Sequence, residues 1–474
     1  VCRMRVAPRR GVAAVGAAGA PPRRSPANLG GVSEPWFEPG GAGPILTHPV
    51  PVRARRVDPP PRPRALLAAL ADRSWPILVP HHGTIVVACD PAAVALGAEA
   101  WDVLAHRPDA GGAAHAAAGA WIGLLAYDLG GTIERLPAPH ADPGGPPTAA
   151  LGRYDTVAVF DHLGGCIITS VDADEAPLAR LALLAARLGA RTPRRHRAPR
   201  PRRPDVASSL PGRAYGRAVD EARDLIAAGD CYEVNLAQRL VARWDRGPLA
   251  LADALWAAAG RTSHAAFLGL PGGTVVSASP ERLLALDGPL AVSEPIKGTA
   301  DPGAAAALAA SAKDRAEHVM IVDLVRNDLG RVARTGTVQV RRLMAPYKVG
   351  YADHLVSAVE ARLAEGVTVA DALRALFPGG SVTGAPKVRA MEVIRALEPV
   401  GRGPAYGSIV TMGRDGSLEA SVAIRTAWLT GDEARYWCGG AVVWDSDPDG
   451  ERREAWRKAT PFLTALGADP GAAQ

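Results

Sequence analysis

The chain has 474 residues, of which 48% are hydrophobic and 22% are charged, a composition typical of a globular protein with a sizeable core. Its formal net charge of +6 comes from two arginine-rich, acid-free stretches at 1–30 and 191–204, and no aromatic-plus-basic pattern accompanies them, so nucleic-acid binding is not favoured. Five scattered cysteines without a CxxC pair argue against a disulfide framework or a zinc finger, and we expect a cytoplasmic protein.

The beginning of the chain differs in composition from the rest. Residues 1–45 are rich in Arg, Ala, Gly and Pro and lack apolar periodicity, which predicts a disordered extension. They contain no leucine-rich core with a cleavage site, so they do not resemble a secretory signal. A start site placed too early and a transit peptide remain as alternatives. No later segment is apolar enough to predict a membrane span.

Short apolar runs separated by turns follow over 46–188, which we interpret as an N-terminal region. A helix is expected at 177–188, and the other runs predict strands. These strands are expected at Trp75–Val79, Thr84–Ala88, Trp121–Tyr127, Thr156–Phe160 and Cys166–Val171. A basic Pro/Arg tract at 189–206 is predicted to be a linker or a long surface loop. It separates this region from a second one at 207–468.

The second region opens with a predicted helix, because Val219, Ala222 and Ile226 follow helical spacing. Residues 231–240 alternate as in a half-buried strand, and 273–286 is expected to be one further strand that ends at an Asp-Gly turn. Helices and hairpins intermingle along this region. This order favours an α+β fold with antiparallel sheet over a doubly wound parallel fold.

Two predicted helices carry carboxylates. In the helix at 313–332, Glu317 and Asp328 share a face with large apolar residues, and a buried carboxylate needs a cation or hydrogen-bond donors. On the helical wheel alone, an ion pair with an arginine is the favoured interpretation. In the helix at 450–459, Glu454 and Lys458 form an i, i+4 pair. Carboxylates from two helices, with waters and substrate oxygens, would suit Mg²⁺.

Glycine-rich segments and one lysine complete the candidate chemistry. The glycine-rich loop and helix at 377–394 place Lys387 within reach of an anion. The glycines of 438–447 form a second segment at which the backbone can approach a ligand closely. Together they predict a small anionic ligand held by backbone amides. Lys297, in the sequence Pro-Ile-Lys-Gly-Thr, is by default an exposed cation at a strand end. If it is desolvated instead, its pKa falls and the neutral amine becomes a nucleophile.

These segments together resemble the chorismate-utilising enzymes, a family that includes anthranilate, aminodeoxychorismate, isochorismate and salicylate synthases. The resemblance extends from about Trp121 to the C-terminus, and it implies an α+β fold of four α/β/β/α layers with two orthogonally packed antiparallel sheets. It rests on an ordered series of motifs: LLAYDLG, GDCYEVNLAQR, SPER, PIKGT, SAKDRAEHVMIVDLVRNDLGRV, HLVS, FPGGSVTGAPKVRAMEVI, EASVAIRT and GGAVVWDSD.

Two positions are typical of one branch of this family. Lys297 stands where anthranilate synthases have Ala and aminodeoxychorismate synthases have a Lys that attacks chorismate. Glu233 stands where isochorismate and salicylate synthases have a water-activating Lys. The combination resembles the aminodeoxychorismate synthases, which aminate chorismate on the route to p-aminobenzoate, for folate or a specialised metabolite. The departures Ala405, Val410 and Ala441 concern the shape of the pocket.

The resemblance also implies the roles of the site residues. Lys297 would be the nucleophile and Glu281 the general acid, and His354 would line the same cavity. Glu317 and Glu454 would hold Mg²⁺. The residues expected to bind substrate are Gly298, Thr299, Ser381, Tyr406, Arg425, Gly439, Gly440 and Lys458.

The implied substrates are chorismate and ammonia. We recognise no glutamine amidotransferase segment, so a separate amidotransferase subunit is expected to supply the ammonia in a heterodimer, and no nucleic acid or membrane is expected as a partner. Two alternatives stay open. One is anthranilate synthase component I or another chorismate-aminating enzyme. The other, less favoured because Lys297 and the acidic residues are intact, is a non-catalytic homologue that binds chorismate or tryptophan.

Overall fold

The computed structural model describes residues 53–106, 117–190, 205–300, 302–349 and 352–468. The predicted extension at 1–45 and most of the predicted linker at 189–206 lie outside these residues. The described residues all belong to one compact unit.

The first sheet is antiparallel and has twelve strands within the described residues. Its strands come from both regions of the chain, because β2 pairs with β11. They are β1 (Arg53–Val57), β2 (Ile77–His81), β3 (Thr84–Ala88), β7 (Thr156–Phe160), β8 (Cys166–Ser170), β9 (Val206–Ser208), β10 (Glu233–Arg243), β11 (His264–Leu270), β12 (Gly273–Ser279), β18 (Gly384–Ala385), β21 (Thr426–Thr430) and β22 (Glu433–Val442).

The second sheet, also antiparallel, has ten strands within the same residues. It too combines both regions, since β5 pairs with β19. Its strands are β4 (Ala93–Leu96), β5 (Ala120–Leu125), β6 (Ala149–Tyr154), β13 (Arg282–Asp287), β14 (Leu290–Glu294), β15 (Ile296–Ala300), β16 (Gln339–Val349), β17 (Ala352–Arg362), β19 (Ser408–Met412) and β20 (Leu418–Val422).

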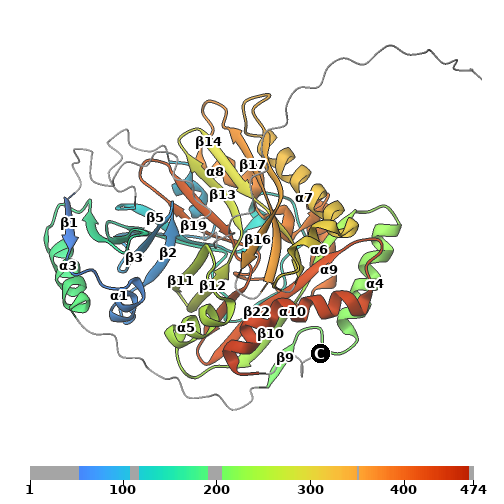
Figure 1. Cartoon of the computed structure of the whole chain (residues 1–474), viewed down its shortest axis with the longest axis horizontal. Helices are drawn as coiled ribbons and strands as arrows, with labels where there is room; N and C mark the ends of the chain where they lie inside the picture. Colours follow the sequence, from blue (N-terminus) through green and yellow to red (C-terminus); the bar gives the residue numbers. More distant parts are fainter. Residues whose placement is uncertain (1–52, 107–116, 191–204, 301, 350–351, 469–474) are drawn as a thin grey trace, which may run out of the picture. The chain divides into compact units, whose positions relative to one another are not determined.

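Helices cover the outer faces of the two sheets (Figure 1). Helices α1, α3, α4, α5, α9 and α10 pack on strands of the first sheet, and α2, α7 and α8 pack on strands of the second. The helices are α1 (Pro63–Ala69), α2 (Glu99–Leu104), α3 (Ala176–Gly189), α4 (Ala214–Ala227), α5 (Pro248–Ala259), α6 (Ala305–Ala310), α7 (Ala312–Gly330), α8 (Val369–Leu376), α9 (Lys387–Leu397) and α10 (Pro448–Leu466), with short 3₁₀ turns η1 (Tyr127–Thr132) and η2 (Gly380–Val382). None of the described helices combines the length and apolarity that crossing a membrane requires.

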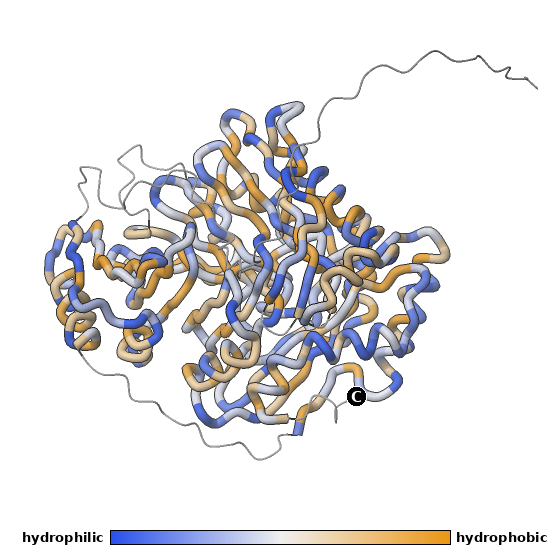
Figure 2. The backbone as a smooth tube through the Cα atoms, in the orientation of Figure 1, coloured by the Kyte–Doolittle hydropathy of each residue, from blue (hydrophilic) through white to orange (hydrophobic). Residues whose placement is uncertain are grey.

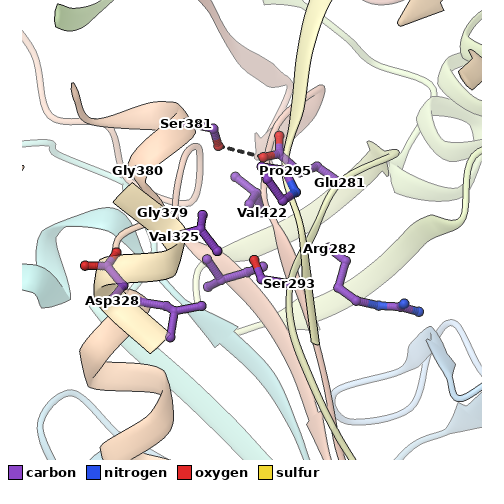
Figure 3. A pocket seen from close by; sticks show the side chains of 12 residues that line it. Glu281, Arg282, Ser293, Pro295, Val325, Asp328, Gly379, Gly380, Ser381 and Val422 are labelled. Atoms are coloured by element: carbon purple, nitrogen blue, oxygen red, sulfur yellow. Dashed lines mark hydrogen bonds between the residues drawn. The ribbon is translucent and has the colours of Figure 1, made fainter. Parts of the chain in front are cut away.

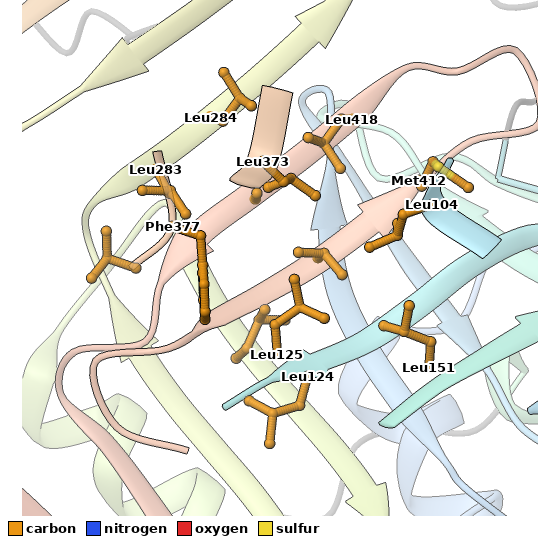
Figure 4. Close-up of a cluster of buried hydrophobic side chains, with 14 of the residues drawn as sticks. Leu104, Leu124, Leu125, Leu151, Leu283, Leu284, Leu373, Phe377, Met412 and Leu418 are labelled. Atoms are coloured by element: carbon orange, nitrogen blue, oxygen red, sulfur yellow. The ribbon is translucent and has the colours of Figure 1, made fainter. Parts of the chain in front are cut away.

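Alternating side chains of the first sheet pack into two cores. On β2, Ile77 and Val79 join a cluster that also contains Leu124 and Leu284 of the second sheet, whereas Leu78 faces the helices. Figure 4 shows part of the cluster that both sheets share, and Figure 2 shows apolar and polar stretches interspersed along the backbone. Each fully buried leucine contributes about 1.5–3 kcal/mol. Two antiparallel sheets with helices on their outer faces confirm the predicted α+β fold class.

The range 273–286 is not the single strand that we expected. β12 ends at Ser279 in the first sheet and β13 begins at Arg282 in the second. Pro280 lies between them, and proline has no amide hydrogen with which to continue a ladder. The prediction of one strand is therefore wrong, and the crossing positions Glu281 where the chain passes from one sheet to the other.

Candidate active site

Lys297 is buried at a contact between the two sheets. It lies on β15, its side chain is only 9% exposed, and its Nζ donates to Oε1 of Glu233 on β10 at 2.8 Å. The default prediction of an exposed strand-end cation is wrong, because β15 is covered by α6 and α7.

The carboxylates around Lys297 determine its protonation. Burial by itself lowers the pKa of Lys297, but the negative charges of Glu233, Glu317 and Glu281 outweigh burial and raise the pKa above its ordinary value. The expectation that desolvation lowers this pKa is therefore wrong in this environment. The resting side chain is an ammonium ion, and it must lose a proton before it can act as a nucleophile.

Glu281 has the properties of a proton donor. Its side chain is buried, and Oγ of Ser381 donates to Oε1 of Glu281 at 2.6 Å (Figure 3). Burial raises the pKa of Glu281 to about 7, although Ser381 and Lys297 act in the opposite direction. A carboxyl group with this pKa is protonated to a large extent at neutral pH, so it can serve as a general acid.

The turn that carries Ser381 is held by tight packing and by a buried arginine. A Cβ atom on Gly380 would lie 2.4 Å from a side-chain atom of Leu324 on α7, so a larger residue there would displace the Leu324 side chain. Nη1 of Arg402 donates to the carbonyl oxygen of Val382 at 2.7 Å. We had not assigned a role to Arg402, because nothing local in the sequence indicates that it reaches this turn.

The two predicted metal ligands lie on helices that meet. Glu317 is on α7 and Glu454 is on α10. Nζ of Lys313 lies 3.9 Å from Oε1 of Glu317 and 3.4 Å from Oε1 of Glu451, and Nζ of Lys458 lies 2.8 Å from Oε1 of Glu454. Glu451 was not among the predicted site residues, although its position three residues before Glu454 indicates the same helical face.

These carboxylates repel one another. Burial raises the pKa of Glu317 to about 7, with Glu233 and Glu454 adding to the effect. Burial and Glu454 raise the pKa of Glu451, whereas Lys458 lowers the pKa of Glu454. Within the described residues, Oε2 of Glu451 is buried without a hydrogen-bond partner.

A hard divalent cation suits such a group of oxygen donors. Across the described ranges, no three His, Cys, Asp or Glu side chains are placed so that they could hold a metal ion by themselves. Water and substrate oxygens would therefore have to complete the shell, as expected for a site with two protein carboxylates.

His354 and Arg425 form a second polar group in the site. Nη2 of Arg425 donates to Nε2 of His354 at 2.8 Å, and Nδ1 of His354 donates to the carbonyl oxygen of Gly298 at 2.7 Å. Burial and the charge of Arg425 lower the pKa of His354 to about 3. His354 is therefore a neutral imidazole whose tautomer is determined by these two bonds, and it fixes the orientation of the Arg425 guanidinium.

Four predicted binding residues lie beside these groups. The Oγ1 atom of Thr299 is 3.4 Å from Nδ1 of His354. Gly298 has a φ of +73°, which favours glycine. A Cβ on Gly440 would lie 3.0 Å from Oε2 of Glu451 and 3.8 Å from Nζ of Lys458, so this glycine leaves room at the carboxylates.

Two further predicted residues have evident structural roles. A Cβ on Gly439 would lie 2.1 Å from the carbonyl oxygen of Leu236, so the pairing of β22 with β10 requires a glycine there. Tyr406 is buried in the core, with the guanidinium carbon of Arg402 4.6 Å from its ring centre. Their proposed contacts with substrate remain predictions.

Lys387 does not face a bound anion. Its Nζ donates to Oδ2 of Asp328 at 2.7 Å and to the carbonyl oxygen of Leu376 at 3.1 Å, at the end of α8. The prediction of an anion contact is wrong, and so is the prediction that Asp328 pairs with an arginine. The pair instead joins α7, α8 and α9.

Comparisons with known proteins agree with this geometry. The family model described as chorismate binding enzyme matches residues 83–464. Aminodeoxychorismate synthase component 1 of Klebsiella aerogenes is 40% identical over 375 residues, which cover 76% of this chain and 78% of that protein. Anthranilate synthase component 1 of Thermus thermophilus is 38% identical over 359 residues, covering 73% and 77%. The crystal structure of anthranilate synthase component I from Streptococcus pneumoniae TIGR4 matches with a TM-score of 0.68 and 26% identity, covering 89% of this chain and 95% of that one.

Proposed function

Because the chain belongs to the family of chorismate-binding enzymes, we propose that it is component 1 of an aminodeoxychorismate synthase. In this reaction an amino group replaces the C4 hydroxyl group of chorismate. The observation that carries the proposal is Lys297, a buried primary amine that lies among carboxylates, one of which is the proton donor Glu281. The relatives named aminodeoxychorismate synthase component 1 support the same assignment.

The proposed reaction has two halves. In the first, the amine of Lys297 adds at C2 of the ring while the C4 hydroxyl group takes a proton from Glu281 and leaves as water. Hydroxide is a poor leaving group, so protonation removes a large part of this barrier. In the second half, ammonia adds at C4 and Lys297 is expelled from C2.

The polar groups around Lys297 would orient the substrate. Arg425, fixed by His354, presents a guanidinium that can bind a carboxylate with two parallel hydrogen bonds. Glu317 and Glu454 would hold Mg²⁺, which supplies positive charge for a substrate carboxylate. Lys458 and the space at Gly440 lie beside the same carboxylates.

The reaction product provides the direct test. Wild-type protein incubated with chorismate, Mg²⁺ and a high concentration of ammonium should form 4-amino-4-deoxychorismate, identified by mass spectrometry against an authentic standard. Glutamine should replace ammonium only after a separate amidotransferase subunit is added, because we recognise no amidotransferase segment in the sequence. Anthranilate as the main product would support the alternative, which relatives named anthranilate synthase component 1 favour. Glutamine-dependent product from the isolated chain would contradict the expectation that a separate subunit supplies the ammonia.

Removing either of the two proposed metal ligands should lower both the turnover and the affinity for a divalent cation. Glu317→Gln and Glu454→Gln are each expected to lower turnover by about 10²-fold or more, because one oxygen ligand and one negative charge are lost. Titration with Mn²⁺, followed by electron paramagnetic resonance, should show weaker binding in both variants. Asp323→Gln, an exposed acid on the same helix as Glu317, is the control and should bind Mn²⁺ normally. Unchanged Mn²⁺ affinity in both glutamine variants would overturn the metal assignment.

A further inference from the structure

The proposed attack leaves one proton without a destination. Lys297 rests as an ammonium ion among carboxylates, and an ammonium nitrogen has no lone pair with which to form a bond to carbon. Glu281 cannot take this proton, because it must itself be protonated to release the C4 hydroxyl group. Some other group must accept the proton before the attack.

Glu233 lies in hydrogen-bond contact with the nitrogen that must lose this proton. Its Oε1 accepts from Nζ of Lys297 at 2.8 Å, and its side chain is fully buried. Within the described residues, its Oε2 is also buried and has no hydrogen-bond partner. A buried carboxylate with an unsatisfied oxygen is costly as an anion. Glu233 therefore presents one acceptor oxygen directly to Nζ of Lys297 and has unused acceptor capacity on the other oxygen.

The backbone holds Glu233 firmly in this position. At the start of β10 it pairs with Ala385 of β18, and the next residue pairs with Val442 of β22. A Cβ on Gly384 would lie 2.1 Å from the carbonyl oxygen of Glu233, so glycine allows β18 to approach this closely. The Glu233 carboxylate therefore faces Lys297 from a rigid point on the opposite sheet.

The other nearby carboxylates have partners of their own. Glu281 accepts from Ser381, and Glu317 lies beside Lys313 at the proposed cation site. The geometry points to Glu233 as the base that takes a proton from the ammonium group of Lys297 and returns it at the end of the cycle. This inference rests on the proposed function and adds a catalytic residue to it.

The proposed steps balance in atoms and charge. One N–H bond of Lys297 breaks as an O–H bond forms on Glu233. The freed electron pair forms the bond to C2, and the C4–O bond breaks with its pair on oxygen, which takes the proton of Glu281 and leaves as water. Ammonia then bonds to C4, the C2–N pair returns to Lys297, and Glu233 gives its proton back. The new ammonium group at C4 returns a proton to Glu281.

The test is Glu233→Gln, which keeps the size of the side chain and removes the base. At pH 7 the rate of covalent adduct formation, followed by rapid quench and intact-protein mass spectrometry, should fall about 10²-fold. Lys297 of the variant must release its proton to water, so the ratio of the variant rate to the wild-type rate should rise roughly tenfold per pH unit. Dividing the two rates cancels the pH dependence that comes from groups present in both proteins. Besides residue 233, the titratable groups that act on Lys297 are Glu281, Glu317, His318 and Glu454.

Two further variants separate a base from a structural support. Glu233→Asp keeps a carboxylate, so it should restore part of the rate of adduct formation. The ratio of its rate to the wild-type rate should not depend on pH. Asp328→Asn is the matched control, because it removes the carboxylate that pairs with the buried Lys387 at 2.7 Å. It should lower the melting temperature, and the ratio of its rate to the wild-type rate should not change with pH. The role of Glu233 would be overturned if Glu233→Gln formed the adduct at the wild-type rate. It would also be overturned if the rate of the variant were lower by the same factor at every pH. Absence of any adduct in the wild-type protein would also overturn it, whereas a main product other than 4-amino-4-deoxychorismate would contradict the proposed function.

Discussion

Replacing Lys297 with alanine is expected to lower the rate of 4-amino-4-deoxychorismate formation by about 10³- to 10⁶-fold, the range seen when a nucleophile is removed from an enzyme. The buried position of the amine among carboxylates supports a direct role in bond formation. Lys297→Arg should be equally inactive, because a guanidinium group does not deprotonate in this pH range. Steady-state rates and adduct trapping with peptide mass spectrometry measure both expectations.

A second buried lysine provides the control for this prediction. Lys387 pairs with Asp328 at 2.7 Å, much as Lys297 pairs with Glu233 at 2.8 Å. Lys387→Met should lower the melting temperature and still form the adduct, because its partners are structural. If Lys297→Ala turned over at the wild-type rate and no adduct were trapped, Lys297 would be a binding cation only.

Replacing Glu281 with glutamine is expected to slow turnover by about 10²- to 10⁴-fold, the usual contribution of a positioned general acid. The sign of the pH dependence follows from the pKa of about 7 to which burial raises this carboxyl group. The acid works only when it is protonated, so the wild-type rate should fall as the pH rises through about 7. The pH profile of kcat in Glu281→Gln should lack this step.

Ser381 allows the same assignment to be tested without removing the carboxyl group. Its hydroxyl group donates to Glu281 and thereby stabilises the charged form, which holds the pKa of Glu281 below the value that burial alone would give. Ser381→Ala should therefore move the fall in rate to higher pH. A step that stays in place in Ser381→Ala, or that survives in Glu281→Gln, would assign it to another group.

Local patterns in the sequence were sufficient for many of the elements. The strands predicted at 84–88 and 156–160 have the bounds of β3 and β7, because apolar alternation there lies between clear turns. The helix predicted at 313–332 corresponds to α7 at Ala312–Gly330. No element was predicted at 248–259, where the alanine-rich α5 shows little periodic contrast. The switch of sheets at Pro280 depends on tertiary pairing that no local pattern contains.

The charges of the site were less predictable than its residues. The resemblance supplied the candidate roles, and the structure places Lys297, Glu281, Glu317 and Glu454 close enough for their charges to interact. The direction of the Lys297 pKa could not be inferred from its apolar neighbours in sequence. That direction depends on Glu233, which is distant along the chain and lies in the other sheet.

The pairing of early strands with late ones has a consequence for synthesis on the ribosome. β5 at Ala120–Leu125 pairs with β19 at Ser408–Met412, and β2 at Ile77–His81 pairs with β11 at His264–Leu270. At usual translation speeds, β5 waits roughly 15 to 60 seconds for its partner to be made. During that interval its open edge can pair with other chains. The growing polypeptide thus exposes an unpaired strand edge until residues 408–412 have emerged.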